Sequence, residues 1–488
     1  MSTTYLGIDV GTSGVKAIII DPKGKALGDA AAPLDVSRPK PGWSEQNPAH
    51  WWEATLAAVD ALSKSHPREL AGVKGIGLSG HMHGATLLDA NDNVLRPAIL
   101  WNDGRSSAEC QEIEQACPNS REIAGNIAMP GFTAPKIQWV RNHEPEIYEK
   151  TAKVLLPKDY VRLLLTGEYV SEMSDASGTL WLDVAKRDWS DKLLAATGLD
   201  RSHMPSLVEG SAPSGNLKSD LVSRWGMNGS VTVAGGGGDN AASACGIGAI
   251  RPGEGFVSLG TSGVLFVSND RFRPNTKGAV HAFCHAIPDT WHQMGVILSA
   301  TDSLNWLANL TGQAAAKLSG DVEEQFSGPG EEIFLPYLSG ERTPHNNANA
   351  RGSFVGLSHI SNPSRMAQAV MEGIAFAFRD SQRVLSDAGT RIDRLVAVGG
   401  GSNSPLWLKM IATNLNMEIH VPHDGDFGGA FGAARLGLCA AESADPTEIC
   451  TMPEIKTVIA PDSALTQSYS NQYARYRALY PAIEEARS

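Results

Sequence analysis

Short apolar runs around a glycine turn occur twice in this chain with the same layout. The pentapeptide Gly-Thr-Ser-Gly-Val stands at residues 11–15 and again at 260–264, and apolar segments flank each copy within residues 5–21 and 256–267. Apolar runs of this length on both sides of a glycine turn predict β-hairpins. The repeat therefore predicts one hairpin at the start of each half of the chain.

The composition of these turns favours phosphate binding. Glycine lets backbone N–H groups approach a phosphate closely, and the hydroxyls of Thr12, Ser13, Thr261 and Ser262 can donate as well. A single turn of this kind is usually no more than a hairpin, because short motifs give many false matches. The duplication favours the phosphate interpretation, in which the two turns hold one polyphosphate from opposite sides.

Strands and helices alternate along the rest of the chain. Asn47 and Pro48 predict a helix start with Trp51 and Trp52 in the core, since Asn caps helices and Pro suits the first helical position. Further strands are predicted at 73–78, 231–234 and 394–398, and helices at 105–117, 157–165, 188–197, 241–248, 363–389, 405–415 and 428–437. Glycine runs at 235–238 and 399–401 follow two of these strands. This alternation is typical of the α/β class.

The two hairpins divide the chain of 488 residues into two large halves. A chain of this length exceeds what one hydrophobic core usually serves. We predict domains at 1–248 and 249–488, with a hinge at 251–253. The small residues of 428–437 predict close packing that would suit a pivot between the domains.

Charge and composition argue against several classes of partner. The formal net charge is −12 without a basic run, which disfavours nucleic acid. The N-terminus lacks a leader pattern and no apolar run is long enough for a bilayer, so we expect a cytoplasmic protein without a membrane partner. The six cysteines are scattered and indicate reduced thiols. His281 and His285 would share one face of a strand without a third ligand, so we interpret them as packing or hydrogen-bonding residues, not metal ligands.

Two common nucleotide motifs do not match. No segment has the Gly-x-x-x-x-Gly-Lys-Ser/Thr form of a P-loop, and the run at 399–402 lacks the Gly-x-Gly-x-x-Gly of a dinucleotide fold. The two hairpins, the acid Asp9 before the first turn and the late glycine loop instead resemble the actin-like ATPase superfamily. Within it, the chain is similar over nearly its whole length to the FGGY family of carbohydrate kinases, and the segments that carry the resemblance are 6–13, 42–46 with 51–52, 237–242, 259–262, 340–344 and 399–402.

Four further segments are most similar to the family members that phosphorylate D-xylulose, namely 80–85, 99–105, 156–160 and 173–178. Two positions depart from that pattern. His81 stands where a glutamine is expected, and the glycine run before Asp239 is one residue longer. The resemblance implies two duplicated actin-like ATPase (ribonuclease H-like) domains of the α/β class with a cleft between them.

The resemblance also assigns roles to residues. A sugar hydroxyl needs a carboxylate to accept its proton as it attacks the γ-phosphorus of ATP, and Asp239 is expected to be this base. Asp9, with Asp239, is expected to hold Mg²⁺ directly or through water. Phosphate contacts are expected from Thr12, Ser13, Lys16, Thr261 and Ser262, adenosine contacts from Gly400, Gly401 and Asn403, and sugar contacts from Met82, His83, Trp101, Asn102, Asp103 and Asp239.

The expected activity is therefore the phosphorylation of D-xylulose to D-xylulose 5-phosphate, with ATP and Mg²⁺ as cofactors. Another ketose or polyol, such as ribulose, is the alternative within the family. A nucleotide-driven conformational protein of the same fold is the alternative outside it, although such a protein has no chemical need for Asp239 or a polar loop at 81–84. The oligomeric state is left open, with a homodimer as one option.

Overall fold

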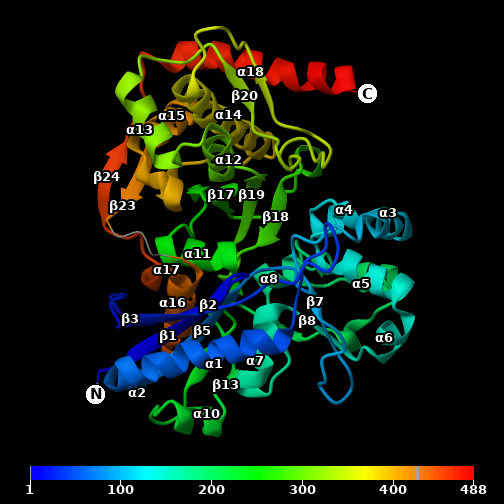
Figure 1. The fold of residues 1–488 in the computed structure, drawn as a ribbon. Coiled ribbons are helices and arrows are strands. Elements are labelled where there is room, and N and C mark those ends of the chain that lie inside the picture. The colour runs from blue at the N-terminus through cyan, green and yellow to red at the C-terminus, as the bar shows by residue number, and fades with distance from the viewer. Residues whose placement is uncertain (1, 424–427, 488) are drawn as a thin grey trace.

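The computed structural model describes residues 2–423 and 428–487. The two halves of the chain lie one above the other in Figure 1, with the first in blue to green below and most of the second in green to red above. Each half is built around a seven-stranded sheet.

The first sheet begins with an antiparallel meander. Its strands run in the spatial order β13 (Pro213–Asn216), β14 (Thr232–Ala234), β5 (Val73–Gly80), β1 (Thr4–Val10), β2 (Gly14–Ile20) and β3 (Ala26–Pro33), and the short β15 (Gly237–Gly238) also pairs with β5. Strands β1, β2 and β3 pair antiparallel, whereas β5 runs parallel to β1 and β14 parallel to β5.

The second sheet repeats this arrangement. Its order is β18 (His281–Cys284), β19 (Trp291–Ile297), β17 (Gly263–Asn269), β16 (Glu254–Leu259), β22 (Arg394–Val398), β23 (Ile419–Pro422) and β24 (Ile455–Ile459). Strands β16, β17 and β19 pair antiparallel, while β22 and β23 continue parallel to β16. In both sheets a last strand, β13 or β24, closes the parallel side in antiparallel orientation. The predicted duplicated α/β fold is confirmed.

Both predicted hairpins form. In the first, Asp9 faces Lys16 across the ladder and Val10 faces Val15, and the Gly11 N–H donates to the Gly14 carbonyl. In the second, Leu259 faces Gly263. The repeated pentapeptide thus forms the tip of a hairpin in each sheet.

Helices cover the sheets and fill the segments between strands. The longer ones are α1 (Pro48–Ser65), α3 (Ser107–Ala116), α5 (Thr133–His143), α7 (Pro157–Thr166), α11 (Asp239–Ile247), α12 (Thr301–Thr311), α13 (Ala315–Gln325), α14 (Pro363–Asp387), α15 (Pro405–Leu415), α16 (Gly429–Glu442) and α18 (Thr466–Arg487). Short helices are α2 (Pro67–Ala71), α4 (Ser120–Ala124), α6 (Pro145–Lys150), α8 (Met173–Ser177), α9 (Asp191–Ala196), α10 (Ser219–Arg224) and α17 (Pro446–Ile449). Short strand pairs are β4 (Glu45–Gln46) with β7 (Ala98–Ile99), β6 (Thr86–Leu88) with β8 (Lys153–Leu155), β9 (Val170–Glu172) with β12 (Ser206–Val208), β10 (Leu182–Asp183) with β11 (Asp188–Trp189), and β20 (Ile333–Leu335) with β21 (Ser353–Val355).

Most predicted element positions are close to those found, with one correction. The start of α1 is capped by Asn47, whose side chain accepts from the Ala49 N–H, and Trp51 is buried in the core. The helix predicted at 188–197 is wrong at its start. Residues 188–189 form strand β11, and α9 begins after Ser190, whose hydroxyl accepts from the Leu193 N–H and caps the helix there.

Helix α16 comes from the second half of the chain but lies on the first sheet, as Figure 1 shows. Glycines make this approach close enough for backbone contact. A Cβ at Gly77 would lie 1.8 Å from the Ala433 carbonyl oxygen, and one at Gly432 would lie 1.7 Å from the Ala242 carbonyl oxygen of α11. The predicted close packing of this helix is confirmed. The domain boundary at residue 248 stays a prediction.

Hydrophobic clusters link the halves. One cluster contains residues of both, among them Met82 and Phe132 from the first and Phe283 and Met294 from the second. Along the described part of the chain, no helix is both long and apolar enough to cross a bilayer.

The contact between α11 and α16 gives a first testable prediction. Gly432→Ala should destabilise the protein by about 1–3 kcal/mol, because the added methyl overlaps the backbone of α11. A Cβ on Gly320 in α13 would have nothing within 4 Å, so Gly320→Ala should instead stabilise by up to about 1 kcal/mol through helix propensity. Thermal unfolding of both variants checks this, and equal effects at the two sites would contradict the packing.

Candidate active site

A cavity of about 240 Å³ lies where the two halves meet. The first half contributes Met82, His83, Trp101, Met129, Gly131, Phe132, Asp239 and Asn240, and the second contributes Ser262, Val264, His281, Phe283, Met294, Val296, Leu298 and Arg342. Apolar side chains form most of this lining, with a few polar groups among them. Such a lining is typical of a small-molecule site.

Strand β5 brings the two predicted catalytic carboxylates together. Its Ser79 faces Asp9 of β1 on one side and Gly237 of β15 on the other, and Asp239 follows directly after β15. All three strands run parallel, so both acids lie at the carboxyl ends of strands, where ligands bind in open α/β sheets. Asp9 and Asp239 therefore lie close together, as expected, because of the order of these three strands.

Asp239 is the first residue of α11 and lines the cavity. The backbone N–H and the side-chain amide of Asn240 both donate to its Oδ1, at 2.7 and 3.0 Å. Burial and the charge of Asp9 nevertheless raise the pKa of Asp239 to about 6. A carboxylate with this pKa is ionised at neutral pH and is a stronger base than an ordinary aspartate.

The surroundings of Asp9 fit a magnesium ion. Its Oδ1 is buried without a hydrogen-bond partner, and a Cβ on Gly429 would lie 2.9 Å from it, so glycine keeps this space open. Burial raises the pKa of Asp9, and the nearby Ser79 hydroxyl and Lys16 ammonium oppose that rise. Among the described residues, no three His, Cys, Asp or Glu side chains form a metal group. Mg²⁺ in phosphoryl-transfer sites is commonly held by one or two carboxylates with water and phosphate, so Asp9 and Asp239 are a sufficient set.

His83 is held in an unusual conformation beside the cavity. Its φ is +72°, which non-glycine residues seldom adopt, and Lys136 Nζ and Thr133 Oγ1 both donate to its carbonyl oxygen. The Gly178 carbonyl lies 2.6 Å from His83 Nδ1, so Nδ1 carries the proton and Nε2 is left as an acceptor. Burial and the Lys136 charge lower the pKa of His83 to about 3, which keeps the ring neutral.

The other predicted sugar residues divide into two groups. Met82 and Trp101 line the cavity with His83, but Asn102 and Asp103 do not. The Asp103 carboxylate instead pairs with Arg105 at 2.7 Å and accepts from the Ser44 N–H at 2.6 Å. Arg105 in turn lies over the Trp43 ring, 3.5 Å from its centre. Asp103 therefore supports the loop that carries Trp101, and the geometry gives no support to its predicted contact with sugar.

Side chains also support the first phosphate hairpin. Gln46 Nε2 donates to the Thr12 carbonyl at 2.7 Å. Trp51 Nε1 donates to Gln46 Oε1 and so fixes the orientation of this amide. Trp101 Nε1 donates to Thr12 Oγ1 at 3.0 Å, which connects the sugar cavity with this hairpin. Ser13 and Thr261 are exposed at the two tips, and Ser262 of the second hairpin lines the cavity with Asp239.

A second cavity, of about 330 Å³, lies beside β22 and β23. Gly400 and Asn403 line it, as predicted for the adenosine side, together with Gly399, Ser402, His423 and Lys456. Gly401 does not line it. A Cβ there would lie 2.8 Å from the Leu259 Cβ, so this glycine allows the loop to lie against the second hairpin.

Sequence reasoning did not select Arg342 and His281 as site residues. Arg342 Nη1 lies 3.0 Å from His281 Nε2, and His281 Nδ1 lies 3.2 Å from Asn126 Oδ1 of the first half. Both residues line the cavity. His281 is thus a hydrogen-bonding residue, as interpreted, and not part of a metal group within the described residues. The segment 340–344 was the one sequence signal that pointed toward Arg342.

Comparison with known proteins agrees with this geometry. Residues 4–246 match the N-terminal domain, and residues 255–441 the C-terminal domain, of the FGGY family of carbohydrate kinases. The chain belongs to this family. It is thus an enzyme of ATP-dependent sugar phosphorylation.

Relatives of this FGGY kinase match over nearly the full length. The chain is 48% identical to a xylulose kinase of Escherichia coli K12, covering 99% of this chain and 98% of the relative, and 35% identical to one of Bacillus subtilis, covering 97% and 96%. A solved xyloylose kinase structure from Brucella ovis superposes with a TM-score of 0.97 at 57% identity, covering 99% of this chain and all of that one.

The contrast between His83 and Asp103 is testable. His83→Ala should lower kcat/KM for the sugar by about 10–10²-fold and leave ATP binding intact, because a buried polar contact to substrate is lost. Asp103→Ala should lower the unfolding temperature instead, since it removes one of the two carboxylates paired with the buried Arg105 and leaves only Glu45. Calorimetry with each ligand and thermal unfolding separate the two effects. A selective loss of sugar binding in Asp103→Ala would contradict the assignment.

Proposed function

We propose that this kinase transfers the γ-phosphoryl group of ATP to the terminal hydroxyl of D-xylulose, giving D-xylulose 5-phosphate and ADP. The names of the full-length relatives support the choice of sugar. The observation that carries the proposal is the position of Asp239, a half-buried carboxylate of raised pKa in one cavity with Ser262 of a phosphate hairpin.

Asp239 acts as the general base. An Oδ of Asp239 accepts the proton of the sugar hydroxyl as its oxygen bonds to the γ-phosphorus, and the bond from the γ-phosphorus to the bridging oxygen breaks, leaving ADP. The Asn240 amide, bound to Oδ1, fixes the orientation of the carboxylate. A pKa near 6 keeps Asp239 ionised at neutral pH and yet basic enough to take a proton in the transition state.

Asp9 and Asp239 would hold Mg²⁺ directly or through water, and the ion would supply positive charge that offsets the negative charge developing on the transferred phosphoryl group. The exposed hydroxyls of Ser13 and Thr261, with Thr12, Ser262 and Lys16, bind the phosphates between the hairpins. Gly400 and Asn403 bind the adenosine side.

The cavity lining suits a small polyol with one apolar face. Met82, Phe132 and Phe283 provide apolar contact, while His83 Nε2 accepts and the Arg342 guanidinium donates. A sugar that leaves either of these groups unpaired loses transition-state binding. The predicted cytoplasmic location and the homodimer option stay predictions.

The sugar assignment is tested by coupled measurement of ADP release against a panel of sugars. D-Xylulose should give the highest kcat/KM, because the full-length relatives are xylulose kinases. Higher values for ribulose, glycerol or gluconate would contradict the substrate and leave the family assignment intact.

The base is tested by Asp239→Asn. This variant keeps shape and the Asn240 hydrogen bonds but cannot accept a proton, so turnover should fall by about 10²–10⁴-fold while nucleotide still binds. Asp191→Asn is a matched control, because the Asp191 side chain is 76% exposed on the surface. Near-normal turnover of Asp239→Asn would eliminate the base assignment.

The raised pKa of Asp239 has two testable consequences, one for activity and one for stability. Because catalysis needs the ionised form, kcat/KM should fall as the pH drops below about 6. The ionised carboxylate also opposes folding, so Asp239→Asn should be more stable than wild type above pH 6, by up to about 3 kcal/mol. This advantage should vanish as the pH falls from 6 to 4, where the aspartate becomes neutral. Denaturant unfolding across this range checks it, and a constant difference would contradict the shift.

A further inference from the structure

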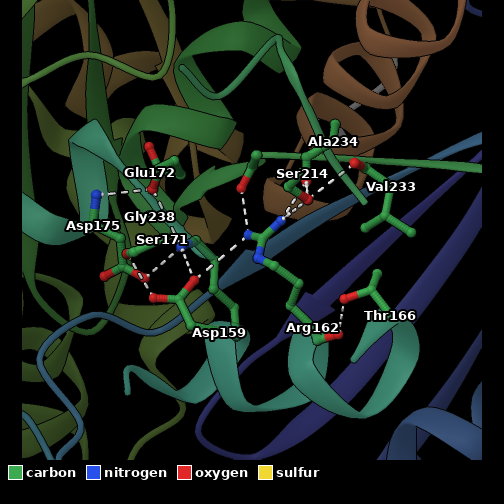
Figure 2. A network of polar contacts seen from close by, with 12 residues as sticks. Asp159, Arg162, Thr166, Ser171, Glu172, Asp175, Ser214, Val233, Ala234 and Gly238 are labelled. Atoms are coloured by element: carbon green, nitrogen blue, oxygen red, sulfur yellow. Dashed lines mark hydrogen bonds and ion pairs between the residues drawn. The ribbon is translucent and has the colours of Figure 1, made fainter. Parts of the chain in front are cut away.

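Five charged side chains lie fully buried in the first half, beside the glycine run that leads to Asp239 (Figure 2). We call Lys158, Asp159, Arg162, Glu172 and Asp175 the buried ion network. They come from α7, from the end of β9 and from α8. None of them lines the sugar cavity, so the mechanism above gives them no role.

The glycine run has no side chains with which to anchor itself. Gly236 has a φ of +76°, and a Cβ there would lie 2.0 Å from the Leu78 carbonyl oxygen. A Cβ on Gly235 would lie 2.3 Å from the Glu209 carbonyl oxygen. The run therefore lies between two backbones. The Gly235 and Gly236 N–H groups donate to the Ala212 and Gly210 carbonyls, both at 2.8 Å, and the two ends of the run need further hydrogen bonds.

Arg162 binds the start of this run. Its Nη1 donates to the Ala234 carbonyl oxygen and its Nη2 to that of Gly235, both at 2.5 Å. Nη1 also donates to Ser214 Oγ at 2.6 Å, and Figure 2 shows the guanidinium directed at this backbone. A planar guanidinium can bind two successive carbonyls in this way, whereas a lysine ammonium lacks the fork.

Ser174 binds the end of the run. Its Oγ accepts from the Gly238 N–H at 3.0 Å and donates to Glu172 Oε2 at 2.8 Å. Glu172 caps α8 by accepting from the Ser174 and Asp175 N–H groups. The peptide that directly precedes Asp239 is thus connected to the buried ion network through one hydroxyl.

The network balances its own charge. Lys158 Nζ lies 2.9 Å from Asp159 and 3.0 Å from Asp175, and these carboxyls raise the pKa of Lys158 against the effect of burial. Burial raises the pKa of Asp175 to about 8. Lys158 and Arg162 thus lie among three carboxyls, and Lys158 Nζ is within 3.3 Å of all three. Buried ion pairs seldom stabilise a fold more than apolar residues of the same volume would, so stability alone does not explain this cluster.

We propose that Arg162 and Ser174 are positioning residues, which clamp the backbone 234–238 at both ends and thereby hold Asp239 at the attacking hydroxyl. The proposal rests on the function proposed above for Asp239. A displacement of about 1 Å at a reacting group costs about 10²-fold in rate, so a backbone without side-chain anchors needs such a clamp.

The test compares two serines of the same helix. Ser174 and Ser177 are both fully buried in α8, and each accepts from a backbone N–H at 3.0 Å, Ser174 from Gly238 and Ser177 from Cys284. Both variants lose a bond from a backbone N–H, and Ser174→Ala also loses the bond to the Glu172 carboxylate where Ser177→Ala loses one to the Met173 carbonyl. Both should lower the unfolding temperature, Ser174→Ala by more, so kcat is compared at a temperature where both variants are folded. Ser174→Ala should also lower kcat by about 10–10²-fold with little change in the KM for ATP, since a displaced Asp239 no longer meets the attacking hydroxyl. Ser177→Ala should keep the wild-type kcat.

Arg162→Lys is the second variant, since it keeps the charge and loses the fork. It should lower kcat with little change in the KM for ATP, and Arg162→Met should be worse. Equal losses of kcat in Ser174→Ala and Ser177→Ala, or a wild-type kcat in Ser174→Ala, would overturn the clamp. Normal activity of Asp239→Asn would contradict both the base assignment and the clamp. An inactive Asp239→Asn together with an unaffected Ser174→Ala would contradict the clamp alone.

Discussion

The desolvation of two neighbouring carboxylates is the constraint on which this structure depends. Water stabilises a negative charge far better than a protein interior does, so two acids in one cleft each make ionisation of the other harder. Asp9 and Asp239 are in this position because β1 and β15 flank β5 at the same end. This unfavourable electrostatic energy raises the pKa of Asp239 to about 6. In the proposed function, a divalent cation between these carboxylates and the phosphates of ATP would offset this negative charge.

Backbone-to-backbone packing is what keeps these acids in place. Gly7, Gly75 and Gly77 allow α16 to lie directly on β1 and β5, and Gly432 allows α11 to lie on α16. Because α11 begins at Asp239 and β1 contains Asp9, this one contact surface fixes both proposed catalytic carboxylates. The buried ion network adds the anchors that the glycines themselves lack.

Local signals in the sequence predicted much of the fold. The repeated pentapeptide identified both hairpins, and Asn47 with Pro48 identified the start of α1, because turns and caps depend on neighbouring residues alone. The helix predicted at 188–197 began too early because residues 188–189 pair with β10 as a strand. The helix begins only after Ser190, which caps it.

The site was predicted less completely, because it depends on contacts between distant segments. Asp239, His83 and Ser262 were selected from motifs and do share a cavity. Asp103 belongs to the same motif as Trp101, but its carboxylate forms a salt bridge with Arg105 whereas Trp101 lines the cavity. No sequence pattern tells which of the two residues lines the cavity. Arg342 and His281 meet across more than 60 positions, and Arg162 reaches a backbone more than 70 positions away. Such contacts are products of the tertiary fold.

The proposed base, Asp239, has a proton affinity set first by burial and then by Asp9. Carbon-13 NMR of the aspartate carboxyls, titrated in the ligand-free enzyme, measures this affinity directly. We predict one carboxyl that titrates near pH 6, is absent from Asp239→Asn, and titrates at a lower pH when Asp9 is replaced by asparagine. An Asp239 signal that titrates near pH 4 in the wild type, or that is unaffected by Asp9→Asn, would contradict it.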